Sequence, residues 1–212
     1  GLLSQMPTQG CHDEEMKAVL LVLTQDPSIP PLPAAGDAAL YTAFDGWNPF
    51  PETHLLVQSC EVGSASELPA IARQHHYPDA RSMFYLPIEL ELASKANPAT
   101  SPRGVFVTYN QPLTPADADE YHRWYSQQHL PDVLACPGFI RAQRFGISGV
   151  SLSPSPWVTT LECMNIYEHS CETVEEYNNA FAHVRAGIAS GKIGMTPTLT
   201  PGAPTSAYGH RK

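Results

Sequence analysis

The chain has 212 residues, of which 42% are hydrophobic and 16% charged, so it is long and apolar enough to bury a core of ordinary size. Its net charge of −9 makes nucleic acid and anionic membranes unsuitable partners, because both require a basic surface. The five cysteines form no CxxC pair and the chain has no permitted N-x-S/T sequon, which predicts free thiols, no metal site and a cytoplasmic location.

The first part of the chain predicts strands that alternate with helices. Ser64 and Glu67 have the spacing of a capping box, with Ser66 as a competing cap, so a helix begins there and runs to about residue 75. Pro87 lacks an N–H, which makes its strand an edge or bulged strand. The remaining predictions are strands at 16–25, 54–62 and 82–92 and a short helix at 38–47.

The second part begins after a proline-rich linker. Thr114 is a good N-cap and Pro115 suits the first helical turn, so we predict a helix from 115 to about 129. Leu130 precedes Pro131, which disfavours helical geometry and should end that helix. Thr173 and Glu176 form a second capping box before an apolar helical stripe. The predicted strands are 105–109, 138–147 and 157–167.

The order of these elements repeats along the chain. Residues 16–93 give β-α-β-α-β, residues 103–190 give β-α-β-β-α, and residues 191–212 form an extended, Pro/Gly/Thr-rich tail. A split β-α-β unit present twice is the ferredoxin-like plan, in which a second copy covers the open sheet face. We therefore expect an α+β fold of two fused ferredoxin-like halves, the first degenerate, that form an α+β barrel with antiparallel sheets. Two unrelated α+β halves are the alternative.

The most informative stretch is EYHRWYSQQHLPDVLACPGFIRAQRF, at residues 120–145. It resembles the dimeric α+β barrel superfamily, in particular its EthD-like members, which carry Y-x-x-W-Y-x-x-x-H, then Pro, then P-G-F at the start of a strand. The matching residues are Tyr121, Trp124, Tyr125, His129, Pro131, Pro137, Gly138 and Phe139. The superfamily includes cofactor-free monooxygenases, lactone isomerases, polyketide cyclases, decarboxylases and haem-dependent enzymes. The first half has FDGWNPFPETH in the matching place, which implies that it has lost its pocket.

The histidine at the end of this helix is the first candidate for catalysis. An imidazole with an ordinary pKa near 6.5 suits His129 to general acid or base chemistry, although a histidine there also suits the helix dipole. Tyr125 and Tyr121 are predicted to hold a substrate oxygen, with core packing as the alternative. The predicted substrate-binding residues are Trp124, His122, Phe139, Asn165 and His54. Arg141 and Arg144 lie on opposite faces of one strand, so either can point inward toward a carboxylate, and an ion pair at the rim is the simpler interpretation.

These residues and the resemblance lead to an expected function. The chain lacks a P-loop and the GxGxxG, HExxH and GxSxG motifs, so nucleotide, nicotinamide and serine-hydrolase functions have no support. We expect a cofactor-independent lyase or isomerase of secondary metabolism, in which proton transfer drives cyclisation, isomerisation or decarboxylation of an aromatic or polyketide-like intermediate. The alternatives are a cofactor-free monooxygenase and a non-catalytic binding protein. The expected partner is a small-molecule substrate, with a homodimer as an option.

Overall fold

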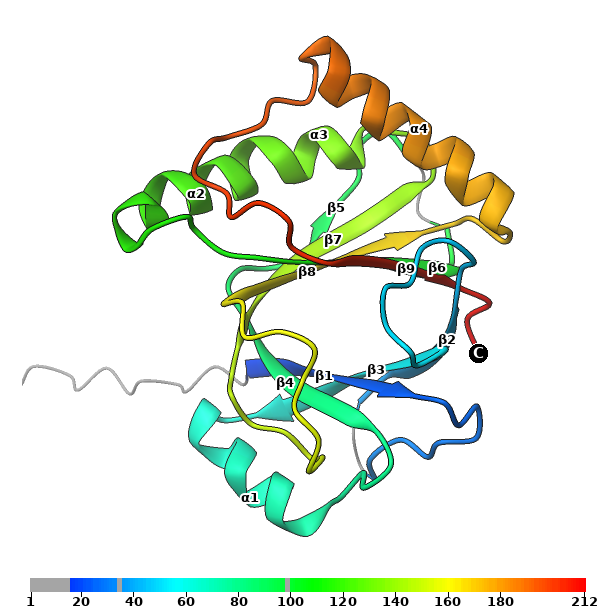
Figure 1. Cartoon of the computed structure of the whole chain (residues 1–212), viewed down its shortest axis with the longest axis vertical. Coiled ribbons are helices and arrows are strands. Elements are labelled where there is room, and N and C mark those ends of the chain that lie inside the picture. The colour runs from blue at the N-terminus through cyan, green and yellow to red at the C-terminus, as the bar shows by residue number, and fades with distance from the viewer. Residues whose placement is uncertain (1–15, 34–35, 98–99) are drawn as a thin grey trace, which may run out of the picture.

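The computed structural model describes residues 16–33, 36–97 and 100–212, which form an α+β fold (Figure 1). The strands are β1 (Met16–Thr24), β2 (Ala38–Ala43), β3 (His54–Val62), β4 (Arg81–Pro87), β5 (Leu92–Ala93), β6 (Gly104–Asn110), β7 (Phe139–Ile147), β8 (Cys163–His169) and β9 (Thr205–Gly209). The helices are α1 (Leu68–Gln74), α2 (Ala118–Trp124), α3 (Leu130–Leu134) and α4 (Val174–Ser190). A π-helical segment (Tyr125–His129) joins α2 to α3, and short 3-10 turns (Ala65–Glu67 and Pro115–Asp117) precede α1 and α2.

The nine strands form one antiparallel sheet in the order β4-β1-β3-β2-β9-β6-β8-β7-β5. Strand β4 also pairs with β7, so eight strands follow one another in a ring of hydrogen-bonded neighbours. The set β4-β1-β3-β2 and the set β9-β6-β8-β7 share one order, namely fourth, first, third and second strand. The predicted α+β class and antiparallel sheet are confirmed. The division into halves at 16–93 and 103–190 stays a prediction, and the tail contributes β9 between β2 and β6.

Helices lie on the outer faces of both strand sets. In Figure 1, α2, α3 and α4 cover the set that contains β6 and β8, while α1 lies on the opposite side, below β1 and β3. Between the two sets is an apolar cluster that includes Leu21, Tyr85, Tyr109, Phe145 and Tyr208. Two further clusters lie under the outer helices. This layered burial is what two sheet faces and their covering helices require.

The sequence located most elements correctly, the capping box of Ser64 and Glu67 is present, and Thr173 caps its helix without the reciprocal bond from Glu176. Strand β3 has the predicted bounds, Thr114 and Asp117 cap the turn before α2, and the N–H of Glu176 donates to Thr173 Oγ1 at 3.1 Å. Four cysteines, Cys60, Cys136, Cys163 and Cys171, carry free thiols as predicted, and Cys11 lies outside the described residues. Within the described ranges, no helix is long and apolar enough to cross a bilayer.

One predicted element was wrong in type, and two predicted strands were too long at one end. Residues 38–43 are strand β2 and not a helix, because Ala39 and Tyr41 bury alternate positions and the segment pairs with β3 and β9. The strand predicted at 157–167 begins only at Cys163, since Trp157 leaves the sheet and donates to Tyr85 Oη at 2.9 Å. The strand predicted at 82–92 ends at Pro87, and it is not the predicted edge strand, because β4 pairs with β1 on one side and with β7 on the other.

Candidate functional site

The helix that carries the sequence motif does not end at residue 129. It continues through Leu130 and Pro131 to Leu134, because the five residues before Leu130 adopt π-helical geometry. The N–H of Leu130 donates to the carbonyl oxygen of Tyr125, five residues earlier. A π-turn leaves a backbone carbonyl without its usual donor, which accommodates the missing N–H of proline. Residues 118–134 therefore form one continuous helical arm over the sheet, with Tyr125 and His129 in its middle segment.

A polar row crosses the sheet face beneath this arm. Strand pairing places Thr108 of β6 beside Asn165 of β8, and Asn165 beside Arg144 of β7. All three side chains are buried, and Asn165 Nδ2 donates to Thr108 Oγ1 at 2.9 Å. Polar side chains rarely occupy the centre of a covered sheet unless they serve a hydrogen-bond network or a ligand.

Tyr125 connects the helical arm to the polar row. Its hydroxyl oxygen accepts N–H groups from Asn110 at 3.0 Å and Asn165 at 3.1 Å, and Thr108 Oγ1 lies 3.4 Å away. Tyr121 joins the same network through Asn110, because its hydroxyl donates to Asn110 Oδ1. The two tyrosines and two amides therefore hold one another in place, and Tyr125 is the member of this network at the cavity.

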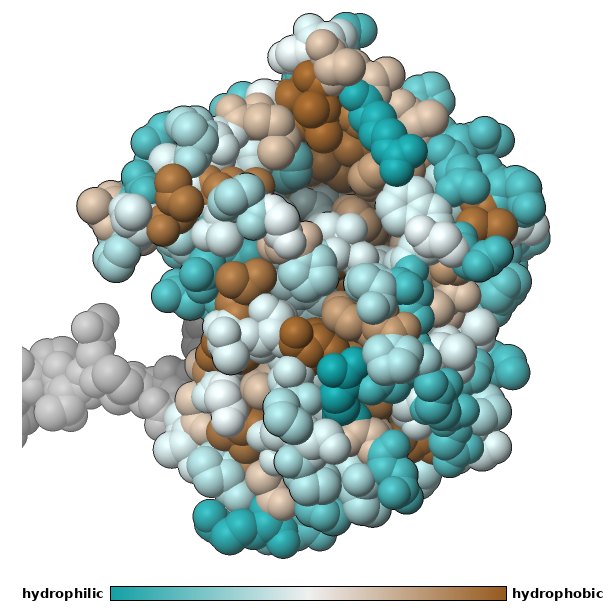
Figure 2. Space-filling model, viewed as in Figure 1, coloured by the Kyte–Doolittle hydropathy of each residue, from teal (hydrophilic) through white to brown (hydrophobic). Residues whose placement is uncertain are grey.

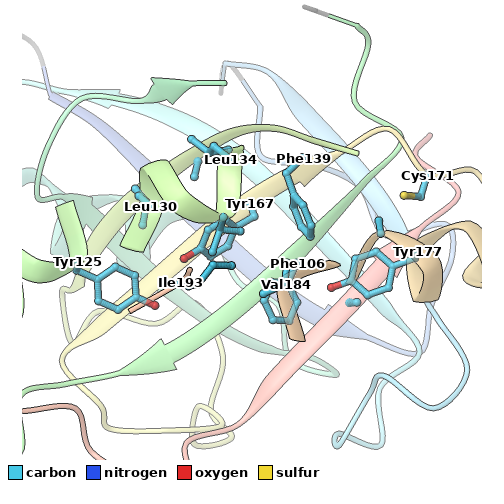
Figure 3. Close-up of a cluster of buried hydrophobic side chains, with 14 of the residues drawn as sticks. Phe106, Tyr125, Leu130, Leu134, Phe139, Tyr167, Cys171, Tyr177, Val184 and Ile193 are labelled. Carbon is cyan, nitrogen blue, oxygen red and sulfur yellow. The ribbon is translucent and has the colours of Figure 1, made fainter. Parts of the chain in front are cut away.

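A cavity of about 260 Å³ lies between β6, the helical arm, α4 and the chain that leads to β9. Its polar lining includes Thr108, Asn110, Tyr125, His129 and Tyr167. The apolar lining includes Phe106, Val133, Phe181, Val184, Ile188, Met195 and Leu199. Figure 3 shows Tyr125 and Tyr167 near each other at one end of the buried cluster, with Tyr177 at the other.

Two side chains at this cavity have buried polar atoms without a partner. His129 Nδ1 and Tyr167 Oη make no hydrogen bond, and neither does Oδ1 of Asn165, whose amide donates to Tyr125. Burial lowers the pKa of His129 to about 4, so its imidazole is neutral at pH 7. Its ring stacks on Trp124 with centroids 4.6 Å apart, which fixes the ring plane. Unpartnered buried polar groups are rare in native proteins and call for an explanation, and a polar ligand supplies one.

The other predicted site residues lie around or away from the cavity. Trp124 backs His129 and donates its indole N–H to the Gly194 carbonyl at 3.0 Å. His122 lies against Arg144 on the far side of Tyr125. Phe139 is fully buried among core aromatics and does not line the cavity. His54 starts β3 and its Nδ1 lies 3.3 Å from Thr42 Oγ1, so the structure does not bring it to this site.

Several residues of the network escaped the sequence reasoning. Thr108, Asn110 and Tyr167 were not proposed, and Arg144 was considered as an inward-pointing partner for a carboxylate, with a rim ion pair as the simpler interpretation. Two polar side chains near the end of the apolar run VFVTYN were a signal for Thr108 and Asn110, because a strand buried on both faces is otherwise apolar. Nothing in the sequence marks Tyr167, whose position depends on the pairing of β8 with β6.

A second, larger cavity of about 400 Å³ lies inside the ring of strands. Three of its charged lining groups pair with one another, since Arg141 lies 2.6 Å from Glu168 and 3.6 Å from Glu91, and Arg211 Nε donates to Tyr41 Oη at 3.3 Å. None of its described lining residues has an unpartnered buried polar atom. The cavity beneath the helical arm is therefore the better candidate for a specific ligand site.

A metal ion and a haem each require particular side chains, which can be sought among the described residues. They contain no group of three or more His, Cys, Asp or Glu side chains that is arranged to hold a metal ion. A haem carries two propionates, which need cationic partners, and no lysine or arginine is among the described residues that line the cavity beneath the arm. The lining residues therefore do not fit a haem.

No protein-family model and no curated protein matches this sequence. Solved structures do match. One is an anthrone oxidase-like protein, with a TM-score of 0.50, 12% identity and coverage of 94% of both chains. Others are a candidate monooxygenase from Fusobacterium nucleatum subsp. nucleatum (TM-score 0.48, 9% identity, 92% of both chains) and a mutant chlorite dismutase from Candidatus Nitrospira defluvii (TM-score 0.48, 8% identity, 91% of both chains). The first of these supports the ferredoxin-like α+β fold, and at such low identity it supports the fold alone.

Proposed function

We propose that the chain is a small cofactor-independent enzyme that removes a proton from an enolisable, mainly apolar, aromatic or polyketide-like molecule. The observation that carries this proposal is the pair of unpartnered buried atoms, His129 Nδ1 and Tyr167 Oη, at the same cavity as Tyr125. An apolar cavity with a few converging polar groups is the usual form of a small-molecule site.

The residues suggest a division of labour in this reaction. His129 is neutral at pH 7, so its unpartnered nitrogen is free to accept a proton from a substrate carbon. Its low pKa makes it a weak base in the empty site, and an anion formed beside it favours the imidazolium and so assists the transfer. Tyr125, held by Asn110 and Asn165, lies where the substrate oxygen gains negative charge.

The surface near the cavity agrees with an apolar substrate. Ile188 and Met195 belong to the cavity lining and are also 38% and 51% exposed, so they reach from the cavity to solvent. Figure 2 shows an apolar patch beside the C-terminal end of α4. Apolar surface at a cavity entrance favours a ligand with an apolar body.

Two outcomes are open to a substrate that has lost its proton. In the first, the carbanion cyclises or is protonated at another position, as the sequence resemblance implies, whereas in a decarboxylation the carbanion would form by loss of CO2 instead of a proton. In the second, the carbanion reacts with O2, so that a CH2 group and O2 become a carbonyl group and water. The structural neighbour named as anthrone oxidase-like favours the second outcome as an alternative. A non-catalytic binding protein would use the same cavity without proton removal.

Proton removal can be tested without knowing the natural product. Anthrone and a set of aromatic β-diketones are incubated with the protein in D2O, and deuterium incorporation is measured by mass spectrometry alongside O2 consumption. We expect exchange that falls about 100-fold or more in His129→Ala and Tyr125→Phe. His54→Ala is the matched control and should retain full exchange. Full exchange in both site variants, or tight binding without exchange, would reject the proposed function.

A further inference from the structure

Arg144 is the largest side chain that is fully buried in the described structure. Its guanidinium donates to Ser126 Oγ at 2.9 Å and to His122 Nδ1 at 3.0 Å, while its Nε has no partner. Burial and the neighbouring Arg144 lower the pKa of His122, so this imidazole is the neutral acceptor that the contact requires. Every described hydrogen-bond partner of this cation is therefore neutral.

No counter-ion compensates this buried charge within the part of the chain that the structure describes. Arg81, Arg103 and Arg141 have carboxylates within 4.0 Å, and Arg144 does not. The carboxylates of Glu162, Glu89 and Asp119 act to raise the pKa of the neighbouring His122, but none of them is within hydrogen-bonding distance of it. A buried charge without an opposite charge normally destabilises a protein by several kcal/mol. The presence of the uncompensated Arg144 charge therefore indicates a role other than stabilising the fold.

Arg141 provides an internal contrast on the same strand. Its side chain points to the other face of β7, is part-exposed and pairs with Glu168 at 2.6 Å and Glu91 at 3.6 Å. Arg141 therefore has the ordinary environment of a structural arginine. The unusual one is Arg144, on the face covered by the helical arm.

The positive charge of Arg144 lies directly behind the cavity. Its guanidinium carbon is 4.7 Å from the centre of the Tyr125 ring and 5.5 Å from that of Tyr121. Tyr125 lines the cavity and Arg144 does not, so the Tyr125 ring separates the cation from any ligand. In a buried, low-dielectric setting, a charge one aromatic ring away still favours a negative charge at the cavity.

We propose that Arg144 is a positioning residue that makes the Tyr125 end of the cavity selective for an anionic oxygen, such as a phenolate or an enolate. The inference rests on the proposed function for the identity of that anion, because proton removal from an enolisable substrate creates one. Asn110 and Asn165 direct amide N–H groups at the same end, so the ligand oxygen lies beside a site that favours negative charge.

The test uses 4-nitrophenol as the probe, because its phenolate absorbs near 400 nm while the neutral form does not. The probe is titrated with pH in the presence of saturating wild-type protein, and the pKa of the bound phenol is compared with that in Arg144→Met and Arg144→Gln. The thermal unfolding midpoint of each variant is recorded first. We expect the bound pKa to rise by about one unit in both variants, which is about a tenfold loss of preference for the phenolate.

Arg144→Lys and Arg141→Met are the matched controls. The lysine retains a positive charge and should restore part of the phenolate preference, and the Arg141 variant should behave as wild type. Wild-type protein that fails to bind the probe, or that binds it equally well after Arg144→Gln, overturns the inference. Unfolding of both neutral variants would assign Arg144 to core packing and overturn it as well. Because no turnover is measured, phenolate preference without deuterium exchange would reject the proposed function and leave this inference standing.

Discussion

The third strand of each set carries a buried amide, and the two amides have different environments. Gln58 of β3 is fully satisfied, because its Oε1 accepts the N–H of Leu32 at 2.8 Å and its Nε2 donates to Tyr77 Oη at 3.3 Å. Asn165 of β8 leaves its Oδ1 without a partner beneath the cavity. The third strand therefore carries a fully bonded amide in the first set and an amide with an unpartnered acceptor in the second.

The cause of this difference is the segment after the first strand of each set. After β1, a proline-rich stretch replaces a helix and inserts Leu32 into the core, where Tyr77 also donates to the Pro30 carbonyl at 2.6 Å. After β6, a long helical arm spans the sheet and keeps a space beneath it. The backbone of a loop lacks internal hydrogen bonds, so it bonds to buried side chains of the sheet and fills the space above them. A helix bonds its own backbone groups, so the side chains of the sheet beneath it stay available for other partners.

The largest expected effect is on the joint where β9, β6 and β8 meet within the second strand set. A Cβ at Gly104 would overlap the carbonyl oxygen of Tyr208 and the imidazole of His169, where β6 lies between β9 and β8. We expect Gly104→Ala to lower the free energy of unfolding by about 3 kcal/mol or more, measured by chemical denaturation. Gly63→Ala, which meets only the Glu67 side chain at 3.5 Å, is the control and should change little. A stable Gly104→Ala protein would show that this joint is adjustable.

Replacing the two amides tests the comparison directly. Gln58→Leu should destabilise the protein by about 1–3 kcal/mol, because it leaves the Leu32 N–H without its acceptor and removes the amide that donates to Tyr77 Oη. Asn165→Leu should leave the unfolding midpoint nearly unchanged, since Thr108 and Tyr125 remain close enough to pair. It should also reduce deuterium exchange at least tenfold. Equal stability losses in the two variants would remove the distinction between the two amides.

A smaller effect is expected from pH, through two imidazoles that both lie in the second set. Burial lowers the pKa of His129 and of His169 to about 4. Between an ordinary pKa near 6.5 and 4, the unfolded chain binds protons that the folded chain does not. Stability is therefore full above about pH 6.5 and falls as the pH drops toward 4. Chemical denaturation at several pH values gives the number of protons taken up on unfolding. His129→Gln should lower that number by about one, whereas His183→Gln, at an exposed position, should not change it.

The sequence alone located much of this protein. Short runs rich in apolar and β-forming residues identified β1, β3, β6 and β7, and the Ser64, Thr114 and Thr173 caps marked the starts of helices, because both signals are local. The motif around His129 led to the helical arm and to two residues of the cavity, Tyr125 and His129 itself. The α+β class followed from the order of these elements.

Only the tertiary structure decided which buried polar groups meet. Local rules ended the helix before Pro131, and the π-turn that carries it onward forms in a segment packed on the sheet, with Tyr125 and Leu130 buried. Residues 38–43 joined a sheet because β3 and β9 were available on either side. The network of Thr108, Asn165, Arg144 and Tyr125 depends on strand register between segments far apart in the chain. Sequence periodicity shows which face of a strand is buried, and the pairing of strands determines what that face touches.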